Sequence, residues 1–452
     1  MSSDPSLSGL RSALNLLIGI FVVSGVLLQI VGFTISGWLW IAVFGTYVAL
    51  NFRMVRPNGA LLLVLAAAAL GLAYYLNGAI DLEGVVRASF LFALMLLFRY
   101  VAPLADRTRE IGQMAELVVS RPAGQRYLFV TFGTHVMAML LHIGGLMFVI
   151  ALLRSRMEQL GPATYRSLVA GAMRGFGANS LWSPFAIAVL VTLSGVPSVP
   201  YLQFAPIALF VMVCYLMAGY WLERPLLTSG GRKLTGEDRR LVLWVAFAVL
   251  ALSLTIASVA HLFQISLIQV VFFVVLAGAV AWTAMLVARG ELAARSIGGM
   301  AALAAASITN ENVIVWTSNV LGVVAGSILV SAGWLHEGLS PWLATLIAGL
   351  LPGFIVLLAV LAVNPLASVP ILAGLLNPVW PDSAKFWLVL PLIWGWGASA
   401  GGTAFMANIM LTAKQIGISS TTLAYGWNGR FTAITVAVFS IVAACGTALT
   451  LM

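Results

Sequence analysis

A glycine-rich stretch, GFGANSLWSPF, occupies residues 175–185, and a related stretch, GWGASAGGTAF, occupies residues 395–405. Both glycines at the start, the alanine and the final phenylalanine are identical, and one aromatic and two amide or hydroxyl positions are similar. Each stretch interrupts a long apolar run. Glycine and proline there free backbone N–H and C=O groups, which in hydrocarbon must be satisfied by protein, water or a ligand. The pair therefore predicts two broken membrane helices at a binding site.

The composition places the chain in a membrane. Of its 452 residues, 62% are apolar and 8% are charged, whereas a soluble domain carries about 25% charged residues. At about 20 apolar residues per spanning helix, this content predicts an all-α polytopic membrane protein without a separate catalytic or nucleic-acid-binding domain. Cys214 and Cys445 both lie in apolar runs, which excludes a disulfide framework and a thiolate metal site.

The basic residues constrain the topology. The net charge of +9 comes mostly from arginines in short loops, which is the pattern of an inserted protein rather than of a nucleic-acid-binding surface. The loops predict a cytoplasmic N-terminus and a periplasmic or extracellular C-terminus in a bacterial-type inner membrane. The candidate spans are residues 14–32, 37–52, 59–76, 85–103, 127–153, 168–196, 203–222, 241–259, 266–288, 311–335, 340–376, 385–413 and 430–452.

Two of these runs are predicted to enter and leave on the same side. Basic residues flank run 127–153 at both ends, so a single crossing would put one basic cluster outside. The run therefore predicts a re-entrant hairpin that turns within 141–145. Run 340–376 is long enough for a second hairpin, which turns near Asn364-Pro365. The total is about eleven transmembrane helices plus two re-entrant hairpins.

The order of the elements indicates an inverted repeat. Each glycine-rich stretch follows a hairpin and precedes one further span, and the loop charges give the two stretches opposite directions. Membrane carriers are often built from such repeats, with discontinuous helices at the site. The alternative is that the glycines only permit close helix packing. The six glycines assigned to the broken helices are Gly175, Gly177, Gly395, Gly397, Gly401 and Gly402.

Polar residues gather at the same breaks and at the hairpin tips. Half-helix N-termini attract anions and half-helix C-termini attract cations, so these residues are predicted to bind a small anion. No resident cofactor is expected, and the coupling ion is H⁺ or Na⁺. The predicted substrate-binding residues are His142, Gly144, Asn179, Ser180, Trp182, Ser183, Asn364, Ser368, Ser399, Thr403 and Asn408.

The stretch GASAGGTAFMAN, residues 397–408, resembles the ion-transporter superfamily, which includes arsenite-permease/sodium–proton-antiporter and divalent-anion/sodium-symporter families. In that superfamily a hairpin with a polar tip precedes a broken helix of the form G-x-N-x-x-G-T-x-x-x-P/A-N, and the unit occurs twice, inverted. The tips here depart from the superfamily's Ser-Asn-Thr or Asp-Asn, since they read HIGG at 142–145 and NPLAS at 364–368.

The resemblance implies a homodimer in which a transport domain moves like an elevator against a scaffold. The transport domain would comprise 116–222 and 340–452, and the scaffold 1–115 and 223–339. The partners expected are the anion, membrane lipid and a second copy of the chain, with no nucleic acid.

The sequence also narrows the function. It contains no G-x-x-x-x-G-K-[ST] loop, which disfavours an ATP-driven pump, and no H-E-x-x-H. The expected function is a secondary active transporter of a carboxylate-like anion; a cation/proton antiporter, a channel and an intramembrane enzyme are alternatives. His142 is either the proton carrier or a structural histidine. Arg174 is interpreted as an anchor that reaches the membrane surface, and 104–122 as an amphipathic surface helix.

Overall fold

The computed structural model describes residues 5–78, 80, 82–105, 107–108, 123–224, 236–332 and 338–452. These residues form helices and contain no strand. Ten of the described helices are long and apolar enough to cross a membrane, which confirms the predicted all-α polytopic membrane protein. The predicted surface helix 104–122 lies almost entirely outside the described residues.

Residue contacts divide the chain into two compact units. The first comprises Met1–Thr108, Ile268–Gly338 and Pro370–Val379, and the second comprises Arg109–Leu267, Leu339–Val369 and Trp380–Met452. The helix that follows residue 235 groups with the second unit through its packing on the helix before it. A short segment from Pro370 groups with the first unit.

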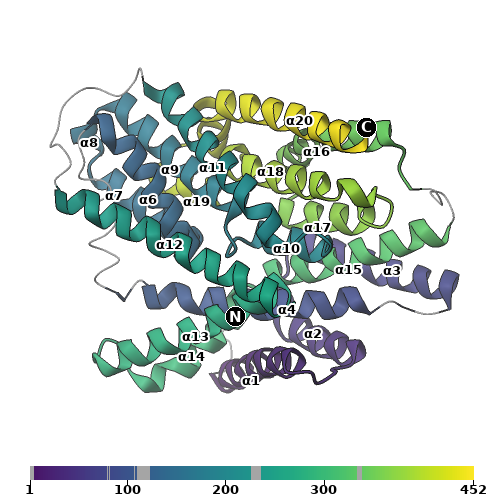
Figure 1. The fold of residues 1–452 in the computed structure, drawn as a ribbon. Helices are drawn as coiled ribbons and strands as arrows, with labels where there is room; N and C mark the ends of the chain where they lie inside the picture. The colour runs from purple at the N-terminus through teal and green to yellow at the C-terminus, as the bar shows by residue number, and fades with distance from the viewer. Residues whose placement is uncertain are drawn as a thin grey trace. The chain divides into compact units, whose positions relative to one another are not determined.

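The first unit is a bundle of helices (Figure 1). Its helices are α1 (Pro5–Ile30), α2 (Gly37–Asn51), α3 (Pro57–Asn77), α4 (Glu83–Ala105), α13 (Leu267–Ala288), α14 (Ile297–Ser307) and α15 (Thr309–Ser331). Helix α4 packs on α1, α2, α14 and α15, α15 also packs on α3, and α1 packs on α14. Phe44 stacks on Trp316 with ring centroids 4.1 Å apart. The sequence did not predict α14, because its 11 residues are too few for a span.

The second unit contains two sets of helices in the same order, except that the part of the second set from Pro370 to Val379 groups with the first unit. The first set is α6 (Ala123–Leu141), α7 (Ile143–Ser155), α8 (Met157–Leu160), α9 (Pro162–Trp182), α10 (Ile187–Gly195) and α11 (Tyr201–Glu223), followed by α12 (Gly236–Leu262). The second set is α16 (Pro341–Val360), α17 (Pro365–Leu376), α18 (Phe386–Gly402), α19 (Ala407–Ile416), a π-helical turn η5 (Thr422–Trp427) and α20 (Gly429–Leu451). Helices α6 and α11 pack on α9, and α16 and α20 pack on α18 (Figure 1).

The two predicted hairpins take different forms. The first run turns at His142, whose φ of 52° is uncommon for a residue with a side chain. Its two arms pack closely, since a Cβ atom on Gly145 would lie 2.5 Å from the Met137 carbonyl oxygen. The second run is a 20-residue helix, α16, followed by α17. From Pro370 onward α17 packs in the first unit, where Gly374 lies against Gly322 of α15.

Candidate substrate site where two broken helices cross

The two helix breaks have the same backbone geometry. In the first, the N–H of Ser183 donates to the Asn179 carbonyl at 3.2 Å, and in the second the N–H of Thr403 donates to the Ser399 carbonyl at 3.1 Å. The residue before the next helix is extended in both, with φ and ψ of −75° and 127° at Ala186 and −71° and 137° at Met406. The second break lies about 220 residues after the first, as expected for a structural repeat.

Helices α9 and α18 contact each other through matched glycines. A Cβ atom on Gly177 would lie 2.9 Å from the Gly397 carbonyl oxygen, and a Cβ atom on Gly397 would meet Leu181. Such a close approach of two helix backbones requires small residues. Gly175 and Gly395 serve the same purpose on the outer sides, against Thr131 of α6 and against α16 respectively.

All six predicted glycines therefore lie within α9 and α18, and the breaks follow directly after these helices. Gly401 faces Tyr215, because a Cβ atom added to Gly401 would lie 2.9 Å from the Tyr215 hydroxyl oxygen. Gly402 faces Thr432. The glycines bring helices together, while the segments 183–186 and 403–406 interrupt them.

Protein groups satisfy several of the carbonyls that the breaks leave free. At the second break, Asn408 Nδ2 donates to the Ala400 carbonyl at 2.7 Å and Asn428 Nδ2 donates to the Gly401 carbonyl at 2.6 Å. At the first break, the Tyr201 hydroxyl donates to the Trp182 carbonyl at 3.0 Å. Asn179 Oδ1 is buried and has no hydrogen-bond partner among the described residues. It is thus an acceptor available to a ligand or an ion.

The first hairpin tip meets the first break. His142 reaches the backbone of Phe185, which lies within the break. Trp182 Nε1 donates to His135 Nε2 at 3.1 Å, so the neutral His135 ring carries its proton on Nδ1. Trp182 is buried by this contact rather than left open as a pocket wall.

The remaining predicted residues near the breaks and the first tip differ in burial and in their hydrogen bonds. Ser183 is buried and its Oγ accepts from the N–H of Phe185, while Ser180 is half-buried and Gly144 is exposed. Ser399 and Thr403 are buried and donate to carbonyls one turn back, at 2.8 and 3.0 Å. The structure therefore brings the first tip and both breaks into one unit.

The second predicted tip has a local role. Asn364 Oδ1 accepts from the N–H of Leu366 at 2.9 Å, as a residue that caps the start of a helix does. Ser368 is buried in α17, and its hydroxyl has no partner among the described residues. These hydrogen bonds belong to α17 rather than to a break.

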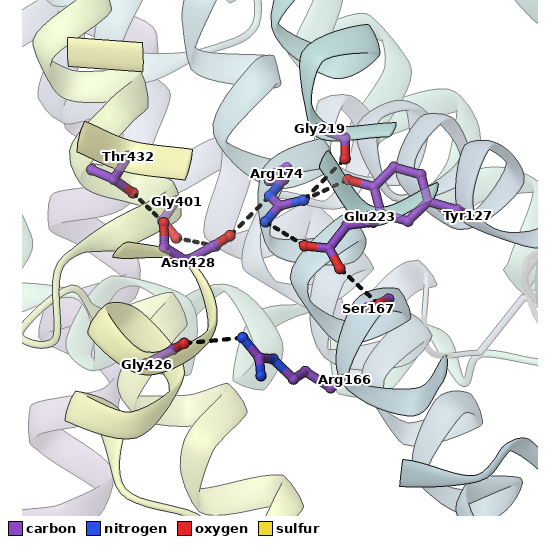
Figure 2. A network of polar contacts seen from close by, with 10 residues as sticks. All are labelled: Tyr127, Arg166, Ser167, Arg174, Gly219, Glu223, Gly401, Gly426, Asn428 and Thr432. Atoms are coloured by element: carbon purple, nitrogen blue, oxygen red, sulfur yellow. Dashed lines mark hydrogen bonds and ion pairs between the residues drawn. The ribbon is translucent and has the colours of Figure 1, made fainter. Parts of the chain in front are cut away.

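A buried ionic network beside the second break was not predicted (Figure 2). Arg174, in the middle of α9, is fully buried. Its Nη2 donates to Glu223 Oε1 at 2.9 Å, and its Nε donates to Asn428 Oδ1 at 2.8 Å. Its Nη1 donates both to the Tyr127 hydroxyl at 2.9 Å and to the Gly219 carbonyl at 3.3 Å. The interpretation of Arg174 as a surface anchor was wrong, because its charge is neutralised inside the protein.

The same network joins four helical segments. Glu223 Oε2 accepts from the Ser167 hydroxyl at 2.7 Å, and the guanidinium lies 4.3 Å from the centroid of the Phe431 ring. The partners of Arg174 are 45 to 254 residues away in sequence, so no spacing reveals them. The one available signal is that an ionisable residue within an apolar run is a functional candidate by default.

Among the described residues, no group of three or more histidine, cysteine, aspartate or glutamate side chains is placed to hold a metal ion. Cys214 and Cys445 are free and exposed. The chemistry of the site is therefore that of amides, hydroxyls, helix ends and one buried ion pair.

These features define a multi-pass α-helical membrane protein with a fold shared by membrane transporters. The structure is similar to that of Neisseria gonorrhoeae MtrF, which represents a class of antimetabolite efflux pumps, with a TM-score of 0.56 and 12% identity over 86% of this chain and 95% of that one. It is also similar to the Alcanivorax borkumensis YdaH transporter, with a TM-score of 0.52 and 14% identity over 86% of this chain and 98% of that one. No family model and no curated protein matches the sequence. At these identities the likeness extends to the fold alone.

Proposed function

We propose that the protein is a secondary active transporter that carries a small, carboxylate-like anion at the crossing of α9 and α18. The observation that carries this proposal is the repeated break, with matched backbone geometry after Trp182 and after Gly402. Each break begins a new helix whose N-terminus offers free N–H groups and partial positive charge. Two such ends beside buried amides and hydroxyls suit a carboxylate or a similar anion.

The transport mechanism that we propose is an elevator motion of the second compact unit in a homodimer. The second unit contains both breaks and all of both repeats except Pro370–Val379, so a site between the breaks would move as one body. Re-entrant insertion of the first hairpin, a bacterial-type inner membrane and a cytoplasmic N-terminus belong to the same proposal.

The coupling ion is H⁺ or Na⁺, and each has a candidate group. His142 lies at the hairpin turn against the backbone of the first break, where it is placed to exchange a proton. Asn179 Oδ1 is a buried acceptor oxygen at the end of α9, which suits a hard cation. Protonation or cation binding beside an anion favours anion binding through reciprocal linkage.

A thermal-shift screen tests this proposal. Purified protein is heated with acetate, benzoate, succinate or sulfate, with and without sodium, at pH 5.5 and pH 7.5. Because a ligand stabilises the folded state in proportion to the logarithm of its concentration over its dissociation constant, a bound anion raises the melting temperature. Sodium dependence assigns Na⁺ as the coupling ion, and loss of pH dependence in His142→Gln assigns H⁺.

Uptake into proteoliposomes provides the second measurement. Accumulation against a gradient, driven by sodium or by a pH difference, is the expected result. Flux that only runs downhill would indicate a channel, and cation exchange without anion movement would indicate the antiporter. Because MtrF is described as an antimetabolite efflux pump, antimetabolites with a carboxylate group belong in the same assay in the export direction.

A further inference from the structure

We propose that Asn428 is a positioning residue that connects the buried Arg174–Glu223 ion pair to the end of α18 and thereby prepares the second break for an anion. This inference rests on the proposed function, because it names what sets the affinity of that same site.

The direction of both Asn428 hydrogen bonds is fixed by chemistry. A guanidinium only donates, so Asn428 must present Oδ1 to Arg174 Nε, at 2.8 Å. A carbonyl only accepts, so Nδ2 must face the Gly401 carbonyl, at 2.6 Å. Asn428 is also 1% exposed, which leaves its amide little freedom to turn. A continuous chain of donors therefore runs from the cation to the end of α18.

The Gly401 carbonyl is the group on which this chain acts. Because α18 ends at Gly402, this carbonyl has lost its partner within the helix. The carbonyls at a helix end carry about half a negative charge, which would repel an anion in the adjacent break. A polarised amide that donates to Gly401 offsets that charge, as Asn408 does at the neighbouring Ala400 carbonyl.

The preceding turn explains how Asn428 comes to lie here. The segment Thr422–Trp427 is π-helical and ends directly before Asn428. A π-turn displaces the residues that follow it relative to an α-turn, and such turns occur often at functional sites. The titratable side chains around the amide are Arg174 of α9 and Tyr127 of α6, together with Glu223 and Tyr215 of α11.

Two substitutions of the same residue test the proposal. Asn428→Asp keeps the size and the acceptor for Arg174, but it turns an oxygen toward the Gly401 carbonyl and adds negative charge beside the break. Asn428→Leu removes both hydrogen bonds without adding charge. We expect the dissociation constants for benzoate and succinate to rise about tenfold for Asn428→Asp and about threefold for Asn428→Leu. A purely structural role predicts the opposite order, because the aspartate preserves more of the packing and of the contact with Arg174.

Hydrogen exchange of residues 399–410 gives a readout that does not need a substrate. We expect faster exchange in both Asn428 variants than in the wild type, since the end of α18 loses its donor. Arg166→Gln is the matched control, because Arg166 is exposed and donates to the Gly426 carbonyl of the same turn at 3.1 Å. It is expected to behave as wild type in both measurements.

The outcomes separate the two proposals. If the wild type binds and transports none of the anions, the proposed function fails. If hydrogen exchange of residues 399–410 is the same in both Asn428 variants as in the wild type, the positioning of α18 by Asn428 is overturned, whatever the anion measurements show. If the wild type binds an anion and Asn428→Asp binds it as tightly, the role of Asn428 in anion affinity is overturned while the proposed function stands.

Discussion

The two repeats of the second unit hold different chemistry at matched positions. Arg174 of α9 and Trp394 of α18 both lie eight residues before the end of their helix. Arg174 pairs with Glu223 of α11, and Trp394 pairs with Phe439 of α20. The first pair forms a buried salt bridge of 2.9 Å. At the second pair there is no charge, although the two breaks have the same backbone geometry.

The hydrogen-bond partners of Arg174 are polar groups, whereas the neighbour of Trp394 is aromatic. Arg174 also donates to the Gly219 carbonyl of α11, whereas Trp394 stacks on the ring of Phe439 of α20, with ring centroids 4.8 Å apart. The ion pair depends on direction and charge, whereas the stack depends on shape and apolar area. The two halves thus share the path of the backbone at the breaks, while each is stabilised by different side chains.

The largest expected effect is on the ion pair. Glu223→Met leaves the Arg174 cation buried without its partner, and Arg cannot lose its proton, so we expect a loss of about 3–5 kcal/mol in unfolding free energy. Arg174→Met should cost less, because the remaining carboxyl group can take up a proton. Unfolding in mixed micelles, followed by circular dichroism at pH 7, measures both.

The double variant Arg174→Met with Glu223→Met is the control. Replacing both partners removes the buried charges together, so most of the lost stability should return. If the double variant is as unstable as the sum of the single variants, the two residues do not interact and the contrast with Trp394 and Phe439 disappears.

The next largest effect is expected at Gly177 and Gly397, the glycines where α9 and α18 cross. Gly177→Ala places a methyl group 2.9 Å from a backbone oxygen, whereas Gly397→Ala meets mainly the flexible end of Leu181. We expect Gly177→Ala to cost about 1–3 kcal/mol, as overpacking does, and Gly397→Ala to cost less. The same unfolding assay applies, and equal losses would mean that the backbones separate freely at this contact. Gly45→Ala is a control, because nothing lies within 4 Å of its added Cβ atom.

The aromatic stack is expected to tolerate change better than the ion pair. Phe439→Leu keeps an apolar side chain and loses the ring contact with Trp394, so we expect a loss of about 1 kcal/mol. The loss should be the same at low and at high salt. Phe405→Leu serves as the control, since Phe405 is exposed. A strong salt dependence in Phe439→Leu would show that this half also relies on charge.

The smallest effect on stability is expected at the ion pair between Lys385 and Asp382, directly before α18. Lys385 lies 2.6 Å from Asp382 and lowers the pKa of that carboxyl below its ordinary 3.8. Because the folded pKa is the lower one, the pair contributes above pH 3.8 and loses its contribution as the pH falls through the lowered value. Since Asp382 is fully exposed, Asp382→Asn should leave the melting temperature unchanged within error at pH 7 and at pH 3. A clear drop at pH 7 alone would reveal a stabilising role for this pair.

Much of the helical architecture followed from local signals. The two glycine-rich stretches located both the segments that pack at the crossing and the breaks that follow them, because this signal acts within a few residues. The turn at His142 followed from basic residues at both ends of one run. The short helix α14 was missed because it lies between spans and is itself too short to be one.

The sequence by itself determined that the chain is a membrane protein, that it repeats internally and where its helices break. These properties follow from hydrophobicity, backbone satisfaction and loop charge, which are read from neighbouring residues. Only the tertiary structure decided that Arg174 is neutralised inside the protein, that Asn428 reaches the end of α18, and that the two halves are stabilised differently. Those contacts join residues tens to hundreds of positions apart, and the partner that a buried charge or amide finds depends on which helices the fold brings together.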